Sequence, residues 1–329
     1  MRILSRSDVQ RAITMVQAIE AMREAFAELA TGEADVPART AVPIAPHDAV
    51  ALFMPARLSG VPALGGKIVS VHPRNRAAGL PTIHALVVLI DDATGRPIAV
   101  LEAGYLTALR TGAGVGLATD CLARPDARVL ACFGAGAQAE TQIEAVCAVR
   151  PIERVWVQSR SEESARRFVE RMRGRAGVPE SLEIARSARE ALAEADVVCT
   201  ATSSRTPVLD GRDLRPGTHV NAIGAFTTET REVDDETVRR ARIVVDSRPA
   251  CLAEAGDLVI PWNRGLIGGP ETWTELGAIV LGRAPGRTSA DEVTFFKSVG
   301  NAAQDLAAAS VVLREAERQG LGLEISLLM

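Results

Sequence analysis

Long hydrophobic runs are missing from this chain. Its longest apolar stretches have the length of a single strand and are broken by proline, glycine or charge, so we expect no membrane-spanning segment. The start of the chain, Met1–Asp8, lacks the apolar core of a signal peptide, and we expect a cytoplasmic protein. A formal net charge of −4 without a basic face argues against nucleic-acid binding.

Motifs that hold metal ions are also missing. The five cysteines form no CxxC pair and the four histidines show no ligand spacing, so we expect no metal site. Cys132 and Cys199 stand inside apolar, strand-like stretches, where a reduced thiol acts as a small hydrophobe. Reduced thiols again favour the cytoplasm.

The N-terminal part of the chain reads as a helix followed by short strands. Ser7-Asp8 resembles a helix cap, and the helical pattern continues to about residue 30. Strands bounded by proline and glycine follow, and a turn at Asp91–Gly95 joins the last two. Consecutive strands of this kind predict a largely antiparallel sheet. We expect them at 50–54, 63–64, 66–71, 82–90 and 97–101.

A glycine turn follows an apolar stretch in the middle of the chain, and a helical stretch follows the turn. Gly134 permits a tight turn, and Gly136 has no Cβ to block an approaching phosphate. Glu140 to Val149 reads as a helix, whose free N-terminal N–H groups point at the anion, and Ala139 is small enough to let it pack on the strand. Ala137 and Gln138, between the glycines and this helix, are expected beside the cofactor. This GxGxxA pattern predicts a dinucleotide-binding site of the Rossmann type.

Strands alternate with helices from Ala127 to about Asp246, which predicts a parallel, doubly wound sheet. The C-terminal stretch 291–319 is again helical in pattern, and we expect it to return to the first domain. The strands of the parallel sheet are expected at 128–133, 153–158, 181–185, 196–201, 217–222 and 242–246, and its helices at 138–148, 162–173, 187–194 and 234–240.

The predicted fold class is therefore α/β, with a Rossmann-type doubly wound parallel sheet and a second, α+β domain. A chain of 329 residues is long enough for two domains that each bury a core. We expect the Rossmann domain at 121–290 and a discontinuous second domain made of 1–120 with 291–329.

The end of the second parallel strand indicates which cofactor binds. An acidic residue at this place would bind the adenine ribose 2′-hydroxyl and repel a 2′-phosphate. The chain instead has Ser159, Arg160 and Ser161, a cation between two hydroxyls, which suits a phosphate. We expect NADP(H) in preference to NAD(H), which stays possible. The alternative is that Arg160 is an ordinary exposed loop residue.

Four polar residues of the first domain stand in apolar or proline-framed segments: Arg39, Lys67, His84 and Arg110. Taken singly, each is best explained as a side chain that faces solvent. Taken together, two arginines and a lysine suit a carboxylate-binding site, because a guanidinium forms paired hydrogen bonds with a carboxylate.

A series of short motifs in one order resembles the ornithine cyclodeaminase/mu-crystallin family over nearly the whole chain. The matching pieces are Gly66-Lys67-Ile-Val, Gly79-Leu-Pro-Thr82, Leu106-Thr-Ala-Leu-Arg110-Thr111, Phe133-Gly-Ala-Gly-Ala-Gln-Ala139, Ala195-Asp-Val-Val-Cys-Thr-Ala-Thr202, Pro216-Gly-Thr-His219-Val-Asn-Ala-Ile-Gly224, Val245-Asp246-Ser and Phe296-Lys-Ser298-Val-Gly300.

The resemblance implies a homodimer in which the first domain pairs strands across the subunit interface, and a substrate that lies between the two domains. It implies that Arg39, Lys67 and Arg110 surround the substrate carboxylate and its reacting nitrogen. It also implies a row of residues along the cofactor: Thr82, Thr111, Thr202, Ile223 and Ser298.

The chain departs from the cyclodeaminases of that family at two positions. Where they carry an aspartate after the Ala-Ile-Gly stretch, and a lysine four positions on, this chain has Phe226 and Thr230. An apolar ring cannot orient a protonated amine or relay its proton. The sequence is more similar to the ketimine reductase branch, and an aromatic wall at Phe226 suits a cyclic imine.

We therefore expect an enzyme that transfers a hydride to the C2 carbon of a cyclic imino acid, Δ1-pyrroline-2-carboxylate and/or Δ1-piperideine-2-carboxylate. Lys67 would stabilise the substrate or donate the proton, with His84 as a second candidate donor. His219 is expected to be structural. The alternatives are alanine dehydrogenase or ornithine cyclodeaminase activity and, from another class, a non-catalytic protein that binds NADP and a small ligand.

Overall fold

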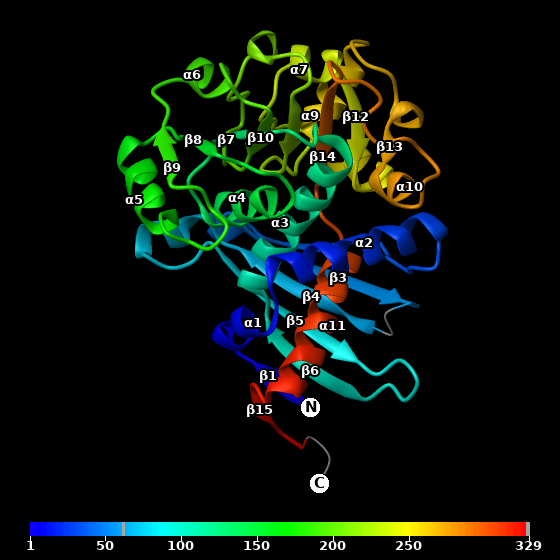
Figure 1. Cartoon of the computed structure of the whole chain (residues 1–329). Coiled ribbons are helices and arrows are strands. Elements are labelled where there is room, and N and C mark those ends of the chain that lie inside the picture. The colour runs from blue at the N-terminus through cyan, green and yellow to red at the C-terminus, as the bar shows by residue number, and fades with distance from the viewer. Residues whose placement is uncertain (61–62, 327–329) are drawn as a thin grey trace. The chain divides into compact units, whose positions relative to one another are not determined.

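The computed structural model describes residues 1–60 and 63–326, which divide into two compact units (Figure 1). The first unit is Met1–Arg110 together with Asn301–Met329, and the second is Thr111–Gly300. The division falls inside helix α3 (Ala103–Leu122) and directly before helix α11 (Ala302–Gln319). Both positions lie about ten residues from the boundaries that the sequence suggested.

The first unit contains a seven-stranded sheet in the order β15-β1-β6-β5-β4-β3-β2. Its neighbouring strands are antiparallel except for β1 and β6, and the Asp91–Gly95 turn closes the β5–β6 hairpin, as expected. The strands are β1 (Arg2–Leu4), β2 (Thr40–Ile44), β3 (Ala49–Leu58), β4 (Ala63–Val71), β5 (Ile83–Ile90), β6 (Pro97–Glu102) and β15 (Leu323–Glu324).

One face of this sheet is covered by α11, which packs on β3, β4 and β5 and on the N-terminal helices (Figure 1). The single helix expected in residues 1–30 is wrong, because two helices form there: α1 (Arg6–Ala12) and α2 (Met15–Thr31). Ser5 and Thr14 each close a capping box with the third helical residue, and the extended backbone at Ile13 separates the helices.

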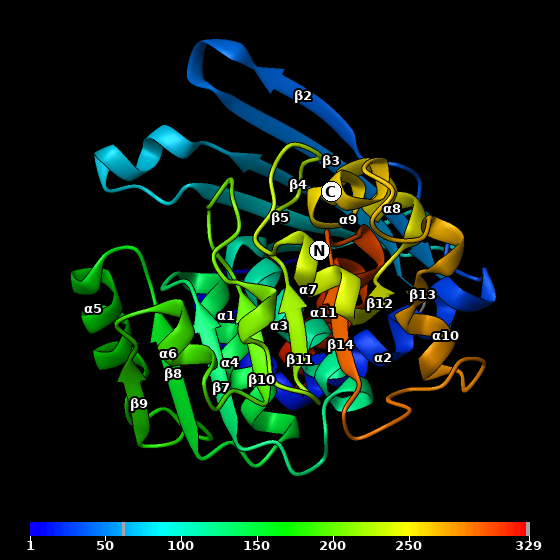
Figure 2. The ribbon, with the colours of Figure 1, turned by 90° about the horizontal axis from the view of Figure 1, so that it is seen from above.

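The second unit contains an eight-stranded sheet in the order β13-β12-β14-β11-β10-β7-β8-β9, in which every pair is parallel (Figure 2). The prediction of a parallel, doubly wound sheet is confirmed. Its strands are β7 (Val129–Phe133), β8 (Arg154–Gln158), β9 (Ser181–Ile184), β10 (Val197–Thr200), β11 (His219–Ala222), β12 (Ala241–Val245), β13 (Thr274–Glu275) and β14 (Val293–Lys297).

Helices cover both faces of the parallel sheet. Because successive strand residues point to opposite faces, each strand contributes side chains to two buried clusters. Leu130, Cys132 and Val155 belong to one buried cluster, and Ala131 and Phe133 belong to the other. None of the helices in residues 1–60 and 63–326 is long and apolar enough to cross a membrane. The helices of this unit after α3 are α4 (Ala137–Val149), α5 (Glu162–Met172), α6 (Ala188–Leu192), α7 (Asp235–Arg240), α8 (Arg248–Glu254), α9 (Gly256–Asn263) and α10 (Leu276–Val280).

The expectation of a helix over 291–319 is wrong for its first part. Val293–Lys297 forms β14, which pairs with both β11 and β12 inside the parallel sheet. The run Val-Thr-Phe-Phe is rich in β-branched and aromatic residues, which favour a strand. The helix starts only at Ala302, where Asn301 and Gln304 form a capping box, so residues 291–300 belong to the second unit.

Candidate functional site

The glycine turn after β7 has the backbone that a dinucleotide needs. Gly134 has a φ of +120°, and a Cβ at this position would lie 2.5 Å from the carbonyl oxygen of Ala201. Only glycine is therefore accommodated here. Gly136 precedes the first turn of α4, and a Cβ there would meet nothing within 4 Å. Together they leave an open, uncapped helix start beside the strand, which fits a pyrophosphate.

The carboxyl ends of the parallel strands lie in register. Phe133 at the end of β7 pairs with Gln158 of β8 and Thr200 of β10, and Thr200 in turn pairs with Ala222 of β11. Ala222 pairs with Lys297 of β14. The loops that follow these strands therefore leave the same edge of the sheet. They carry Gly134, Gly136, Ala137, Gln138, Ser159, Arg160, Ser161, Thr202, Ile223 and Ser298.

Two residues expected beside the cofactor belong to other elements. Thr111 is buried in α3, and Thr82 belongs to the first unit, directly before β5. The backbone carbonyl of Thr82 accepts a hydrogen bond from the N–H of His72 at 2.7 Å.

The loop after β8 presents the cation and hydroxyls that suggested NADP(H). Ser161 caps α5 by accepting the Ser164 N–H at 3.2 Å, so its hydroxyl proton stays available to a ligand. Arg160 is exposed and, among the described residues, pairs with no carboxylate. A phosphate at this place would not compete with an internal ion pair.

Two hydroxyls expected along the cofactor donate to buried carboxylates. Ser298 Oγ donates to Asp246 Oδ2 at 2.7 Å, and Thr202 Oγ1 donates to Glu232 Oε1 at 2.7 Å. Thr202 Oγ1 also accepts the Ser204 N–H at 3.1 Å, so one of its lone pairs is left for a ligand, whereas Ser298 Oγ donates inward and keeps its acceptor lone pairs. Both residues are thereby held in one orientation.

The first unit holds a separate polar cluster, buried between β4, α3 and α11. Lys67 Nζ lies 2.7 Å from Asp305 Oδ2, and Arg110 Nε donates to Asp305 Oδ1 at 2.9 Å. Arg110 also donates from Nη1 to Gln304 Oε1 at 3.1 Å. Lys67 is 2 % exposed, Arg110 6 % and Asp305 0 %, so two cations share one carboxylate out of contact with bulk water.

Burial and charge set the protonation of this cluster. The pKa of Lys67 is lowered to about 8, chiefly by burial and also by the Arg110 and Arg39 cations, while Asp305 opposes the change. Arg39 lies directly before β2 and is half-buried. Burial raises the pKa of Asp305, but Arg110 and Lys67 outweigh it, and the net shift is downward. Asp305 is therefore a stable anion beside a readily deprotonated lysine.

His84 is not part of this cluster. It pairs with Ser70 across β4 and β5, whereas Lys67 pairs with Val87. Because strand residues alternate between faces, His84 lies on the opposite face of the sheet from Lys67. His84 is exposed there, beside Ile68 and Leu86, as the alternative of a solvent-facing side chain requires. Its role as a second candidate proton donor stays a prediction.

Asp305 did not emerge from the sequence. Its signal was a single acid in the otherwise apolar helix start Ala302-Ala-Gln-Asp305-Leu-Ala. An acidic residue in the first turn of a helix is common, since it also favours the helix dipole. Only the tertiary structure shows that α11 presents this carboxylate to Lys67 and Arg110.

The segment that departs from the cyclodeaminase pattern follows β11. Phe226 is 50 % exposed, and Thr230 Oγ1 lies 3.0 Å from Thr227 Oγ1. The chain therefore has a half-exposed aromatic ring at the position where the cyclodeaminases of the resembling family carry an aspartate. His219, at the start of β11, is wholly buried between Thr294 and Asn221, in keeping with a structural role.

Comparison with known proteins agrees with the motifs. The chain is 38% identical over 326 residues to a Δ(1)-pyrroline-2-carboxylate reductase of Bacillus cereus, covering 99% of both chains. The Thermococcus litoralis Δ(1)-pyrroline-2-carboxylate reductase, solved with NADH and L-proline, is 41% identical, with a TM-score of 0.95 over 99% of this chain and 100% of that one. An archaeal alanine dehydrogenase dimer with bound NAD is 36% identical, with a TM-score of 0.91 over 100% and 99%.

The two solved relatives share the fold of this chain over nearly its whole length. The model of one family, described as the ornithine cyclodeaminase/mu-crystallin family, matches residues 1–320. The chain belongs to the ornithine cyclodeaminase/mu-crystallin family.

Proposed function

We propose that this protein reduces a cyclic imino acid, Δ1-pyrroline-2-carboxylate and/or Δ1-piperideine-2-carboxylate, to proline or pipecolate. The observation that carries the proposal is the buried pairing of Lys67 and Arg110 with one carboxylate, Asp305. Two cations on a single anion leave an excess positive charge, which suits a substrate that brings its own carboxylate. The 38% identical bacterial relative, a Δ(1)-pyrroline-2-carboxylate reductase, supports the same substrate class.

Arg110 and Arg39 are proposed to bind the substrate carboxylate. Asp305 holds Arg110 through Nε, and Gln304 holds it through Nη1, so the plane of the guanidinium is fixed before a substrate arrives. A fixed plane favours paired hydrogen bonds to a carboxylate and reduces the entropy lost on binding. Arg39 adds a second cation near Lys67, since its charge contributes to the lowered pKa of that lysine.

Lys67 is proposed to provide the proton. A bound reduced nicotinamide supplies the hydride, which adds to the imine carbon, and the imine nitrogen must hold a proton in the product amine. A lysine with a pKa of about 8 is an ammonium at neutral pH but yields a proton more readily than an exposed lysine. Asp305 keeps Nζ in one place, and solvent must later return the proton.

Phe226 is proposed to be an apolar wall for the ring of the substrate. It stands in the position of the cyclodeaminase aspartate, and its half-exposed ring offers a flat surface rather than a charge. Ornithine cyclodeamination by the route that uses that aspartate is therefore disfavoured.

The cofactor is proposed to be NADP(H) in preference to NAD(H). The support is local: Arg160 is exposed, it lies beside two serines, and no acid follows β8 at that position. Two solved relatives bind NADH and NAD.

A homodimer is proposed to form through the outer face of the seven-stranded sheet. Phe53, Ile68 and Leu86 lie in register across β3, β4 and β5, and each is more than 40 % exposed. An exposed apolar row of this kind commonly marks a protein interface. The archaeal alanine dehydrogenase relative is a dimer. The expected cytoplasmic location stays a prediction.

The test is a spectrophotometric panel. Oxidation of NADPH and NADH is followed with pyrroline-2-carboxylate, with piperideine-2-carboxylate, and with pyruvate plus ammonia, and ornithine is tested with NAD⁺. We expect turnover of at least one cyclic imine well above the other substrates. Preferred turnover of pyruvate plus ammonia would favour an alanine dehydrogenase, and binding without turnover would favour a binding protein.

A further inference from the structure

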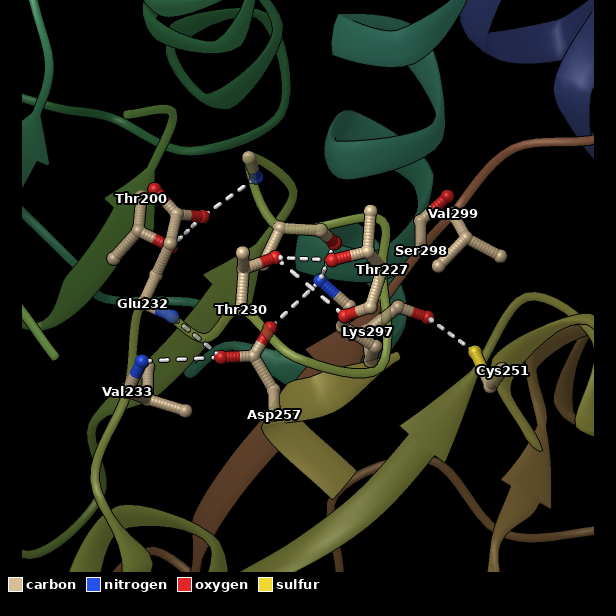
Figure 3. Close-up of polar contacts among 12 residues, drawn as sticks. Thr200, Thr227, Thr230, Glu232, Val233, Cys251, Asp257, Lys297, Ser298 and Val299 are labelled. Carbon is tan, nitrogen blue, oxygen red and sulfur yellow. Dashed lines mark hydrogen bonds and ion pairs between the residues drawn. The ribbon is translucent and has the colours of Figure 1, made fainter. Parts of the chain in front are cut away.

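A buried group of three charged residues lies behind the segment Ile223–Glu232, outside the groups assigned to substrate and cofactor. Glu232 ends this segment, Asp257 lies at the start of α9, and Lys297 ends β14 (Figure 3). Lys297 and Glu232 are 0 % exposed and Asp257 is 1 % exposed, and the hydrogen bonds and ion pairs of all three go to other residues of the chain. Burial of three charges is costly unless each is paired, which makes their partners informative.

Lys297 holds the beginning of the segment. Its Nζ donates to the carbonyl oxygen of Ala225 at 2.6 Å and pairs with Asp257 Oδ2 at 2.8 Å. Burial alone would lower the pKa of Lys297, but the Asp257 carboxylate raises it above its usual value. The lysine is therefore a permanent ammonium with one backbone carbonyl of the segment as a partner.

Asp257 and Glu232 hold the end of the segment and fold it back on its start. Asp257 Oδ1 accepts the N–H groups of Glu232 at 2.7 Å and Val233 at 3.1 Å. The Glu232 carboxylate accepts the N–H of Gly224 at 2.6 Å and the N–H of Thr202 at 2.6 Å. It also accepts the hydroxyls of Thr200 and Thr202. Burial and the Asp257 carboxylate raise the pKa of Glu232, while Lys297 and the hydrogen bonds from Thr202 oppose this rise.

Close packing holds the middle of the segment. The N–H of Gly256 donates to the carbonyl oxygen of Thr227 at 3.1 Å. A Cβ on Gly256 would lie 2.2 Å from the carbonyl oxygen of Thr230 and 2.8 Å from that of Thr227. Only glycine allows α9 to approach the segment this closely.

Phe226 is the residue that these contacts enclose. Its chain neighbour Ala225 is bonded to Lys297, and its other neighbour Thr227 is bonded to Gly256, while the Phe226 side chain itself is half-exposed. A backbone fixed from behind with an aromatic ring turned outward is the arrangement of a preorganised contact surface.

We propose that Lys297, Asp257 and Glu232 are positioning residues that fix the place of Phe226 and thereby determine which ring size the enzyme prefers. The inference rests on the proposed imine reduction. The five- and six-membered substrates differ by one methylene, and an apolar pocket discriminates one methylene by about 10–200-fold. A wall that can shift loses part of this discrimination.

The experiment is a double-mutant cycle that uses the ratio of kcat/KM for the five- and six-membered imines. Lys297→Met, Phe226→Ala and the combined variant are compared with the unmodified enzyme. We expect Lys297→Met to change the ratio by about tenfold or more, and by less than about twofold when Phe226 is already alanine. An effect of equal size in both backgrounds, or an unchanged ratio, would overturn the inference.

Two further variants separate positioning from general destabilisation. Lys297→Met combined with Asp257→Asn removes both charges of the buried pair. Because no unpaired charge is left behind, this double variant can be tested even where Lys297→Met alone unfolds. Asp196→Asn is the matched control. Asp196 lies directly before β10, at the opposite end of this strand from Thr200, and its carboxylate accepts the N–H groups of Arg128 and Val129. The control is expected to lower Tm without changing the ratio. A changed ratio in the control would also overturn the inference.

Failure of the proposed function has a different signature. If the unmodified protein reduces neither imine, imine reduction is wrong and the ring-size inference falls with it. If the unmodified protein reduces an imine and the cycle is additive, only the role of Lys297, Asp257 and Glu232 is wrong.

Discussion

Lys67 Nζ lies 2.7 Å from Asp305 Oδ2, although one residue belongs to a strand of the first unit and the other to the C-terminal helix α11. The same carboxylate holds Arg110 on its second oxygen. Asp305 therefore orients the proposed proton donor and the proposed carboxylate ligand together. Both proposed functions therefore depend on one carboxylate. It is available to them because the C-terminal helix α11 belongs to the first unit.

The pH dependence of the reaction is expected to follow Lys67. Because the pKa of Lys67 is lowered to about 8, kcat/KM for the imine should fall as pH rises through about 8, where the ammonium loses its proton. Asp305 raises this pKa, so Asp305→Asn should move the fall to lower pH. The measurement is a pH profile at saturating cofactor, with cofactor binding measured over the same range. A profile that stays flat to about pH 10 would exclude Lys67 as the donor.

Arg110→Lys tests the carboxylate site. The variant keeps the charge but loses the planar group that bonds Asp305 and Gln304, so we expect kcat/KM for the imine to fall by about tenfold or more. Affinity for NADPH, measured by fluorescence titration, should change much less. Turnover equal to that of the unmodified enzyme would place Arg110 outside the site.

Arg160→Ala tests the cofactor preference. A charge-assisted hydrogen bond to a phosphate contributes about 1.5–3 kcal/mol, so KM for NADPH should rise roughly tenfold or more while KM for NADH changes little. Arg166→Ala is a suitable control, because that arginine lies on α5 and already pairs with Glu162. Equal efficiency of the unmodified enzyme with NADH and NADPH would contradict the preference.

The local features of this chain could be predicted because each depends on neighbouring residues. The glycine turn at Gly134 and the strands β7, β8, β10 and β11 follow from short patterns, and their ends agree to within a residue or two. β14 was mistaken for a helix because a short apolar run has no clear period, and its strand partners β11 and β12 are remote in sequence.

The candidate site could be predicted only where a residue carries its own signal. Lys67 and Arg110 stood out as charges in apolar segments, but their shared partner Asp305 lies within a stretch expected to be helical and carries no such signal. His84 looked equally promising, and only the register of β4 and β5 shows that it faces the other way. The partner of Lys67 and the face on which His84 lies both depend on contacts between elements that are distant in sequence. The spacing of residues along the chain does not reveal these contacts.

His219 predicts a loss of stability in acid. Burial lowers its pKa from 6.5 to about 3, so the folded state resists a proton that the unfolded state accepts. Its contribution is complete above about pH 6.5 and should be lost as pH falls toward 3, by roughly a few kcal/mol. The measurement is the free energy of unfolding by urea between pH 7 and pH 4, compared with His219→Gln. An identical acid dependence in the variant would show that other groups cause the loss.

Phe226→Asp tests what separates this enzyme from a cyclodeaminase. The substitution places a carboxylate beside a substrate that already carries one, and like charges close together in an apolar pocket oppose binding, so imine reduction should fall strongly. Efficient ornithine turnover should not appear, because Thr230 also departs from the cyclodeaminase pattern. Phe226→Leu is the matched control, since it keeps an apolar wall and should retain most of the activity. Substantial conversion of ornithine to proline by the unmodified protein would overturn imine reduction as its main activity and would require a proton relay other than the aspartate route.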